Sequence, residues 1–135
     1  MDKSFGAVVF KKESVIKFLL VKHVSGNHWG FPKGHPIENE KPIETVKREV
    51  LEETNTIIKL IPMFSYSIQY VLPNGENKTV TFFLGEAIES GNHLIDQNEI
   101  VKVEWFNYTM ALDTITFENS KTVLKKAWEY LEHKK

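Results

Sequence analysis

Apolar runs alternate with short polar segments along most of this chain, and their spacing predicts the secondary structure. Near the start, Phe5–Phe10 and Val15–Val21 are rich in β-branched and aromatic residues. The polar tetrapeptide KKES separates these two runs, so the pattern predicts a β-hairpin. The stretch Ser25–Pro36 is rich in Gly, Pro and His, which is typical of a loop.

Two segments have apolar residues three and four positions apart, the spacing of one helix face. The first is Pro42–Thr54, in which Ile43, Val46 and Val50 form the face that we expect to pack on a sheet. The second is Asn119–His133. Its apolar stripe consists of Val123, Leu124, Ala127, Trp128 and Leu131.

The remaining apolar runs predict strands. Ile57–Leu72 has the length of one long strand or two short ones, and Thr79–Ala87 and Val101–Phe106 each predict one more. Between the first two, Pro73–Glu76 has the composition of a tight turn. Strands mixed with two long helices indicate a central mixed β-sheet with helices on both faces, an α/β (α+β) fold. Residues 1–135 are expected to form a single domain.

Composition narrows the class of protein. The net charge of −1 argues against a nucleic-acid partner, because such binders normally carry a basic excess. The chain has no Cys, which excludes disulfides and thiolate metal sites. No run approaches the roughly 20 apolar residues of a membrane span, and the N-terminal apolar run is too short for a signal peptide. We therefore expect a cytoplasmic protein without a membrane partner, and its oligomeric state stays open.

Three glutamates in the first predicted helix are the strongest chemical signal. Glu49, Glu52 and Glu53 share one helix face, because 3.6 residues make a turn. Like charges there repel one another and give an isolated helix no stability. A hard cation such as Mg²⁺ removes the repulsion, because it prefers carboxylate oxygens. We interpret this face as a site where a divalent metal meets a phosphate, although a charged helix face is more often simply solvated.

The spacing around these glutamates resembles the signature of the Nudix hydrolases, G-x5-E-x7-R-E-U-x-E-E-x-G-U, in which U is aliphatic. The matching residues are Gly34, Glu40, Arg48, Glu49, Val50, Glu52 and Glu53. Asn55 stands in place of the family's Gly, and Thr56 in place of its last aliphatic residue. Asn is the non-Gly residue best suited to a left-handed helix end, so the first departure should keep the geometry.

The resemblance implies an αβα sandwich and an enzyme that uses water to cleave a nucleoside diphosphate linked to another group. It implies Mg²⁺, with Mn²⁺ as an alternative, as the cofactor. The implied metal ligands are the Gly34 carbonyl and the carboxylates of Glu49, Glu52, Glu53 and Glu99.

The expected catalytic residues are Glu52, Arg48 and Glu49. Glu52 is the favoured general base for the attacking water. Arg48 is expected to be buried and to orient a glutamate through a bidentate contact. The alternative for Arg48 is a surface ion pair with Glu44, and Glu40 is expected to be structural.

A second resemblance narrows the substrate. The segment His28–His35, HWGFPKGH, is similar to W-x-x-P-K-G-H in the asymmetrical diadenosine tetraphosphate hydrolases, and Lys78–Leu84 is similar to one of their strands. The implied substrate-binding residues are His28, Lys33, Lys78, Phe82 and Phe117. Lysines suit a flexible polyphosphate, and aromatic rings stack on a purine. A core position is the open alternative for Phe82, and Trp29 and Trp105 are expected to pack.

The partner is thus expected to be a small nucleotide, with diadenosine tetraphosphate cleaved by water to AMP and ATP. The same chemistry on nucleoside triphosphates, nucleotide sugars or RNA 5′ ends is an alternative. A catalytically silent module that binds a nucleotide is another. The three intact glutamates count against the silent module, because a binding module has no need of them.

Overall fold

The computed structural model describes residues 2–133 and contains a seven-stranded sheet and three α-helices within them. The strands are β1 (Asp2–Lys12), β2 (Ile16–His23), β3 (Trp29–Gly30), β4 (Lys33–Gly34), β5 (Thr56–Val71), β6 (Asn77–Ser90) and β7 (Ile100–Asn107). The helices are α1 (Pro42–Thr54), α2 (Tyr108–Thr114) and α3 (Glu118–His133), and a short 3₁₀ turn covers Ser25–Asn27.

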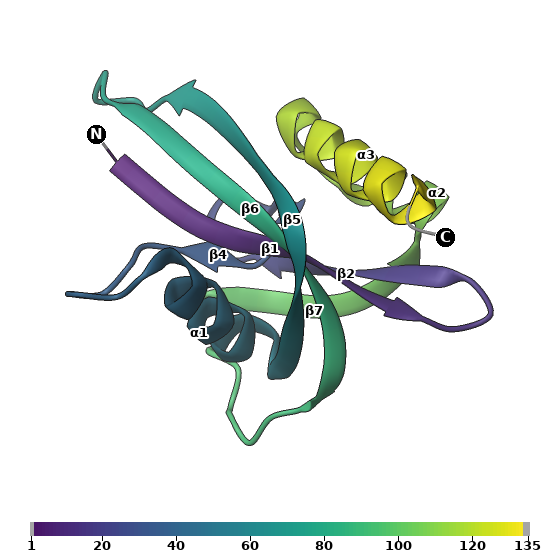
Figure 1. Ribbon diagram of the computed structural model, residues 1–135. Coiled ribbons are helices and arrows are strands. Elements are labelled where there is room, and N and C mark those ends of the chain that lie inside the picture. Colours follow the sequence, from purple (N-terminus) through teal and green to yellow (C-terminus); the bar gives the residue numbers. More distant parts are fainter. Residues whose placement is uncertain (1, 134–135) are drawn as a thin grey trace.

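The strands form one mixed sheet, as predicted. Its main path runs β3-β2-β1-β6-β5, while β4 pairs with β1 and β7 pairs with β2. The β1–β6 pair is parallel, and the other pairs are antiparallel. Helix α1 lies on one side of this sheet and α3 on the other (Figure 1). The αβα sandwich with a central mixed sheet is therefore confirmed.

Each face of the sheet has its own core, because side chains on a strand alternate between faces. On β1, Ala7 and Val9 join the core under α1, together with Val46 and Val50 of that helix. Val8, the residue between them, joins the core under α3. Burial of these two faces holds the helices against the sheet. No helix within residues 2–133 is long and apolar enough to cross a membrane.

Most predicted elements appear where the pattern placed them. The hairpin of β1 and β2 is confirmed by its antiparallel pairing, although both strands are longer than predicted. Helix α1 has the predicted bounds, and Thr56–Val71 forms one long strand. The expectation for Ile43 was wrong: its side chain is 49% exposed, whereas Val46 and Val50 are completely buried. Ile43 lies in the first turn of α1, so it lies too near the helix end to reach the sheet.

Two features were not predicted. The loop between β2 and α1 contains the short strands β3 and β4, which extend the sheet. Helix α2 follows β7 directly, and the signal for it is Asn107, whose side-chain oxygen accepts a hydrogen bond from the Met110 amide at 2.9 Å. An Asn at this position is a typical helix N-cap.

Candidate active site

One cavity of about 350 Å³ collects most of the polar residues singled out in the sequence. We call it the carboxylate cavity. Its lining residues are Ser4, His23, Lys33, Gly34, His35, Glu49, Glu52, Glu53, Lys78 and Glu99. They come from α1, from strands β1, β2, β4 and β6, and from the segments before α1 and β7. Residues far apart in the sequence thus meet in one small volume.

Helix α1 delivers three of the carboxylates. It ends at Asn55, whose backbone is left-handed with φ 53° and whose amide donates to the Leu51 carbonyl at 2.8 Å. The prediction that Asn preserves this helix end is therefore confirmed. Gly34 of β4 faces the helix so closely that a Cβ atom would overlap the Glu49 carboxyl group. Only Gly lets β4 approach this carboxylate.

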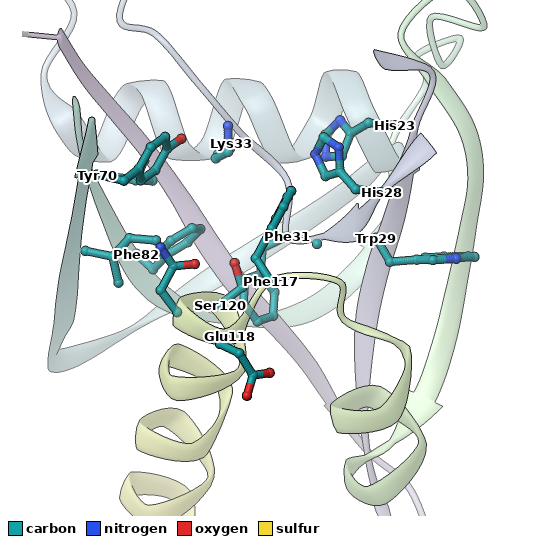
Figure 2. Close-up of a pocket in the computed structure, with 14 residues that line it drawn as sticks. His23, His28, Trp29, Phe31, Lys33, Tyr70, Phe82, Phe117, Glu118 and Ser120 are labelled. Atoms are coloured by element: carbon teal, nitrogen blue, oxygen red, sulfur yellow. The ribbon is translucent and has the colours of Figure 1, made fainter. Parts of the chain in front are cut away.

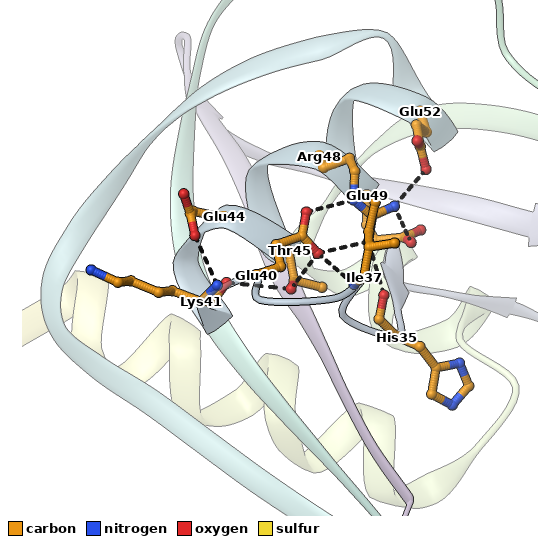
Figure 3. Close-up of polar contacts among 9 residues, drawn as sticks. All are labelled: His35, Ile37, Glu40, Lys41, Glu44, Thr45, Arg48, Glu49 and Glu52. Carbon is orange, nitrogen blue, oxygen red and sulfur yellow. Dashed lines mark hydrogen bonds and ion pairs between the residues drawn. The ribbon is translucent and has the colours of Figure 1, made fainter.

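Arg48 holds the helix and the preceding loop together (Figure 3). Its guanidinium makes a bidentate contact with Glu40 at 2.7 and 3.0 Å and donates to the His35 carbonyl at 2.8 Å. Its Nη1 also donates to Glu49 at 2.9 Å and to Glu52 at 3.0 Å. The bidentate partner is thus Glu40, and the two helix glutamates share the remaining donor. Arg48 makes no ion pair with Glu44.

Glu40 is fully engaged in this network. Besides Arg48, its oxygens accept hydrogen bonds from the Ile37 amide at 3.0 Å and the Thr45 hydroxyl at 2.8 Å. The hydrogen bond from Arg48 is the main reason that the pKa of Glu40 lies well below its usual range. Glu40 therefore stays charged and fixes Arg48, in the structural role expected for it.

Glu53 is the most unusual carboxyl group in the cavity. It is only 6% exposed, and its Oε1 atom has no hydrogen-bond partner. Burial, followed by the nearby Glu49, raises the pKa of Glu53 to about 9. Burial also raises the pKa of Glu49, although Arg48 opposes that shift. A buried polar atom without a partner destabilises a protein unless a ligand satisfies it.

The donor set fits a divalent cation of the Mg²⁺ type. Glu49, Glu52, Glu53 and Glu99 offer hard oxygen ligands around one cavity, and the bare Glu53 oxygen points to an ion as its partner. Within the described part of the chain, no three acidic or histidine side chains converge closely enough to form a ready-made metal site. Closing the set around an ion therefore requires side-chain movement, because Glu52 now bonds to Arg48.

Two lysines bring positive charge to the same cavity. Lys78 is 9% exposed, and Lys33 lies on β4 next to Gly34. Burial lowers the pKa of Lys33, and the Lys78 ammonium lowers it further, while Glu53 and Glu49 raise it. A buried and a half-buried ammonium group that repel each other favour an anion between them. The cavity thus combines cation ligands with anion donors.

A second cavity, of about 610 Å³, opens next to the first (Figure 2). We call it the aromatic cleft. Its lining residues are His23, His28, Trp29, Gly30, Phe31, Lys33, Ile68, Tyr70, Val80, Phe82, Phe117, Glu118, Asn119 and Ser120. His23 and Lys33 line both cavities. The two cavities therefore adjoin each other at these two side chains.

The two predicted stacking rings have different environments. Phe117 is 53% exposed at the start of α3, and its ring centroid lies 5.2 Å from that of His28. Phe82 is 2% exposed and belongs to the core under α3, where its ring meets Phe31 edge-on at 5.4 Å. Phe82 therefore forms the floor of the cleft and cannot close over a base. The open alternative for this residue, a core position, is what the structure has.

His23 and Tyr70 line the aromatic cleft but were not singled out in the sequence. His23 stacks on His28 with ring centroids 4.7 Å apart, and burial, then His28, lowers its pKa to about 4. Burial also lowers the pKa of His28, which disfavours its charged form. Tyr70 lines the cleft from β5 and is 36% exposed. Tyr70 and Ile68 lie two positions apart on β5, so they share the face of the strand that lines the cleft, and this spacing is visible in the sequence.

The family model for the NUDIX domain matches residues 2–126. This chain belongs to the Nudix hydrolases. The matched range contains the signature residues and every strand of the sheet. Nudix hydrolases act on small nucleotide substrates and generally use divalent metals such as Mg²⁺.

Individual Nudix relatives extend this result. The chain is 27% identical to the asymmetrical bis(5′-nucleosyl)-tetraphosphatase of Mus musculus, over 96% of this chain and 95% of that protein. It is 30% identical to the m7GpppN-mRNA hydrolase of Saccharomyces cerevisiae, over 88% of this chain and only 12% of the yeast protein. The crystal structure of a C. elegans Ap4A hydrolase binary complex superposes with a TM-score of 0.88 over 98% of this chain and 99% of that one. At 22% identity, that likeness shows the shared fold.

Proposed function

We propose that this Nudix hydrolase cleaves dinucleoside polyphosphates asymmetrically, with diadenosine tetraphosphate hydrolysed to AMP and ATP. The observation that carries the proposal is the pair of adjoining cavities, which share Lys33 and His23. One cavity has the charges that a phosphate chain needs, and the other has rings for a purine. The full-length match to the mouse tetraphosphatase supports this choice of substrate.

The oxygen ligands of the carboxylate cavity would bind the cation of the proposed reaction. Glu49, Glu52, Glu53, Glu99 and the Gly34 carbonyl would hold Mg²⁺ or Mn²⁺. When bound, the cation neutralises charge on the phosphoryl oxygens, which is the main requirement of phosphoryl transfer.

The remaining roles belong to side chains that act on water and substrate. Glu52, 43% exposed at its side chain, would accept the proton of the attacking water. Arg48 would position Glu49 and Glu52 through the hydrogen bonds that it already makes. Lys33 and Lys78 would bind successive phosphate groups of the substrate's polyphosphate.

The aromatic cleft would bind one nucleoside. Phe117 would stack on the base from the rim, and His28 beside it would contact either the base or the first phosphate. Tyr70 offers a second accessible ring in the cleft, a role that Phe82 cannot fill because it is buried. The second nucleoside would extend from the carboxylate cavity toward solvent.

A panel of substrates tests the proposal. Specificity constants with Mg²⁺ are measured for diadenosine tetraphosphate, ATP, ADP-ribose and an RNA with a capped 5′ end. We expect diadenosine tetraphosphate to have the largest value and EDTA to abolish all activity. A preference for the nucleotide sugar or the capped RNA would reject the substrate while keeping the Nudix chemistry. Binding without turnover of any member would favour the silent nucleotide-binding module.

A further inference from the structure

Ser4 on β1 has a buried hydroxyl group that the site described above does not explain. Its side chain is 1% exposed, and its Oγ atom has no hydrogen-bond partner. Within residues 2–133, the other buried side-chain atom without a partner is Glu53 Oε1. Both residues line the carboxylate cavity. Native proteins satisfy nearly all buried polar groups, so two exceptions in one cavity indicate a missing ligand.

The register of the sheet places Ser4 between the two lysines. Strand β1 has β4, the strand of Lys33, on one side and β6, the strand of Lys78, on the other. Phe5, the next residue, pairs with Gly34, and Asp2 pairs with Lys78. Side chains alternate along a strand, so Ser4 shares the face of Asp2 and Gly6. Ser4 therefore lines the cavity from the strand that lies between the two strands of the lysines, and it shares their face of the sheet.

We propose that Ser4 donates a hydrogen bond from Oγ to a phosphoryl oxygen of the substrate, in a phosphate subsite completed by Lys33 and Lys78. An ammonium has only donors to offer, so these lysines can share an acceptor such as phosphate with the hydroxyl. A metal ion at this end of the cavity would be repelled by both ammonium groups. Hydrogen bonds to charged groups are stronger than neutral ones, which gives the small hydroxyl a measurable effect.

This assignment rests on the phosphate chemistry of the proposed function but not on the identity of the nucleoside. The alternative is that a buried water bridges Ser4 and Glu53 and only stabilises the fold. The two interpretations predict different stabilities for Ser4→Ala. Removing an unsatisfied buried hydroxyl leaves stability unchanged or higher, whereas removing a water-bridged hydroxyl lowers it.

The test uses inorganic tripolyphosphate as the probe, because it has no nucleoside. Melting temperatures of the wild type and Ser4→Ala are measured alone, with Mg²⁺, and with Mg²⁺ plus tripolyphosphate. We expect equal or higher stability for the ligand-free variant, an unchanged response to Mg²⁺, and a clearly smaller shift with tripolyphosphate. The KM of the best nucleotide substrate should rise about tenfold or more.

Two control variants test whether the effect of Ser4→Ala is specific to the Ser4 hydroxyl or follows the loss of any hydroxyl group. Ser67→Ala removes an exposed hydroxyl that bonds to Thr81 at 2.8 Å on β6, and it should keep the wild-type KM and tripolyphosphate shift. Thr45→Val removes a buried hydroxyl that has partners, and it should lower the melting temperature.

Three results would overturn the assignment. A large loss of stability in Ser4→Ala with an intact tripolyphosphate shift would give Ser4 a structural role. If Ser4→Ala loses only the shift in melting temperature caused by Mg²⁺, the hydroxyl would bond to a water molecule of the bound ion and not to phosphate. No tripolyphosphate shift in the wild type would mean that the cavity does not hold a phosphate chain. If Ser4→Ala behaves as expected while diadenosine tetraphosphate is a poor substrate, only the proposed substrate fails.

Discussion

The carboxylate cavity and the aromatic cleft adjoin each other but are built in opposite ways. In the carboxylate cavity, Glu53 and Ser4 have buried polar atoms without partners, and burial raises the pKa of two carboxyl groups. In the cleft, Phe82 and Phe31 pack edge-on as part of the core. The first cavity is locally unfavourable until a ligand arrives, whereas the floor of the second contributes to the stability of the fold.

This difference predicts whether a substitution should change activity or stability. Unfavourable polar groups are retained at functional sites because ligands use them, so their removal should harm activity and spare the fold. Truncation of rings that belong to the core should instead lower the stability of the fold. Phe117 is the exception within the cleft, because it lies on the rim and is 53% exposed.

The largest effect is expected for Phe82→Ala. Truncation of a fully packed Phe removes its burial and leaves a cavity, which lowers the free energy of unfolding by about 3–5 kcal/mol. Urea unfolding measures this loss. A variant with normal stability but much weaker nucleotide binding would show that Phe82 contacts the base and that the cleft is deeper than described.

The next effect is expected for Glu53→Gln in the carboxylate cavity. This change keeps the shape of the side chain but removes its charge, so the fold should persist while turnover falls about 100-fold or more. Steady-state kinetics with Mg²⁺ measures the turnover, and circular dichroism checks the fold. Wild-type turnover in the variant, or full wild-type activity in EDTA, would rule out the metal-dependent chemistry.

A smaller effect is expected for Phe117→Ala, which is the matched partner of Phe82→Ala. Loss of a stacked base should weaken nucleotide binding by about 1–3 kcal/mol. The melting temperature should hardly change, because an exposed ring loses little burial. Calorimetric titration of a slowly hydrolysed nucleotide gives the affinity. A large fall in stability with unchanged affinity would assign this ring to the core.

The smallest effect concerns Glu53 without metal. Its folded pKa of about 9 lies above the ordinary value of 4.5, so its contribution to stability is full below pH 4.5 and is lost as pH rises through about 9. Glu53→Gln does not undergo this loss. Between pH 5 and pH 6 in EDTA, the free energy of unfolding of the wild type should therefore fall relative to that of the variant by about 1.4 kcal/mol, the equivalent of one pH unit.

Measurement near pH 5 supplies the control, because the carboxyl is then protonated in the folded wild type and the two proteins should have similar stabilities. A wild type that is the more stable protein at pH 8 without metal would mean that the Glu53 charge has a partner in the fold.

The sequence predicted the carboxylate cavity better than the cleft, and the reason is physical. The glutamates of α1 lie on one helix, where spacing alone fixes a shared face, and Pro42 and Asn55 mark its two ends. The partner of Arg48 was harder to predict, because Glu44 and Glu40 are both near in sequence. Only the fold of the loop before α1 brings Glu40 into bidentate contact.

The rings of the cleft depend on which strands lie inside the sheet. Phe82 is buried because β6 lies between β1 and β5, whereas Tyr70 remains accessible on the edge strand β5. Alternation along each strand is visible in the sequence, but the order of strands in the sheet is not. Ser4 and His23 were missed because each is one of several polar residues near a strand end, and only the fold brings these two to a cavity.

The most direct test of the account is hydrolysis of diadenosine tetraphosphate in ¹⁸O-water with Mg²⁺, followed by mass analysis of the products. If the carboxylate cavity activates water against one phosphorus while the cleft holds one adenosine, AMP and ATP form in equal amounts. Only one of these two products then carries the ¹⁸O atom, on the phosphate that water attacked. Formation of two ADP molecules, or of products without ¹⁸O on phosphorus, would contradict the account.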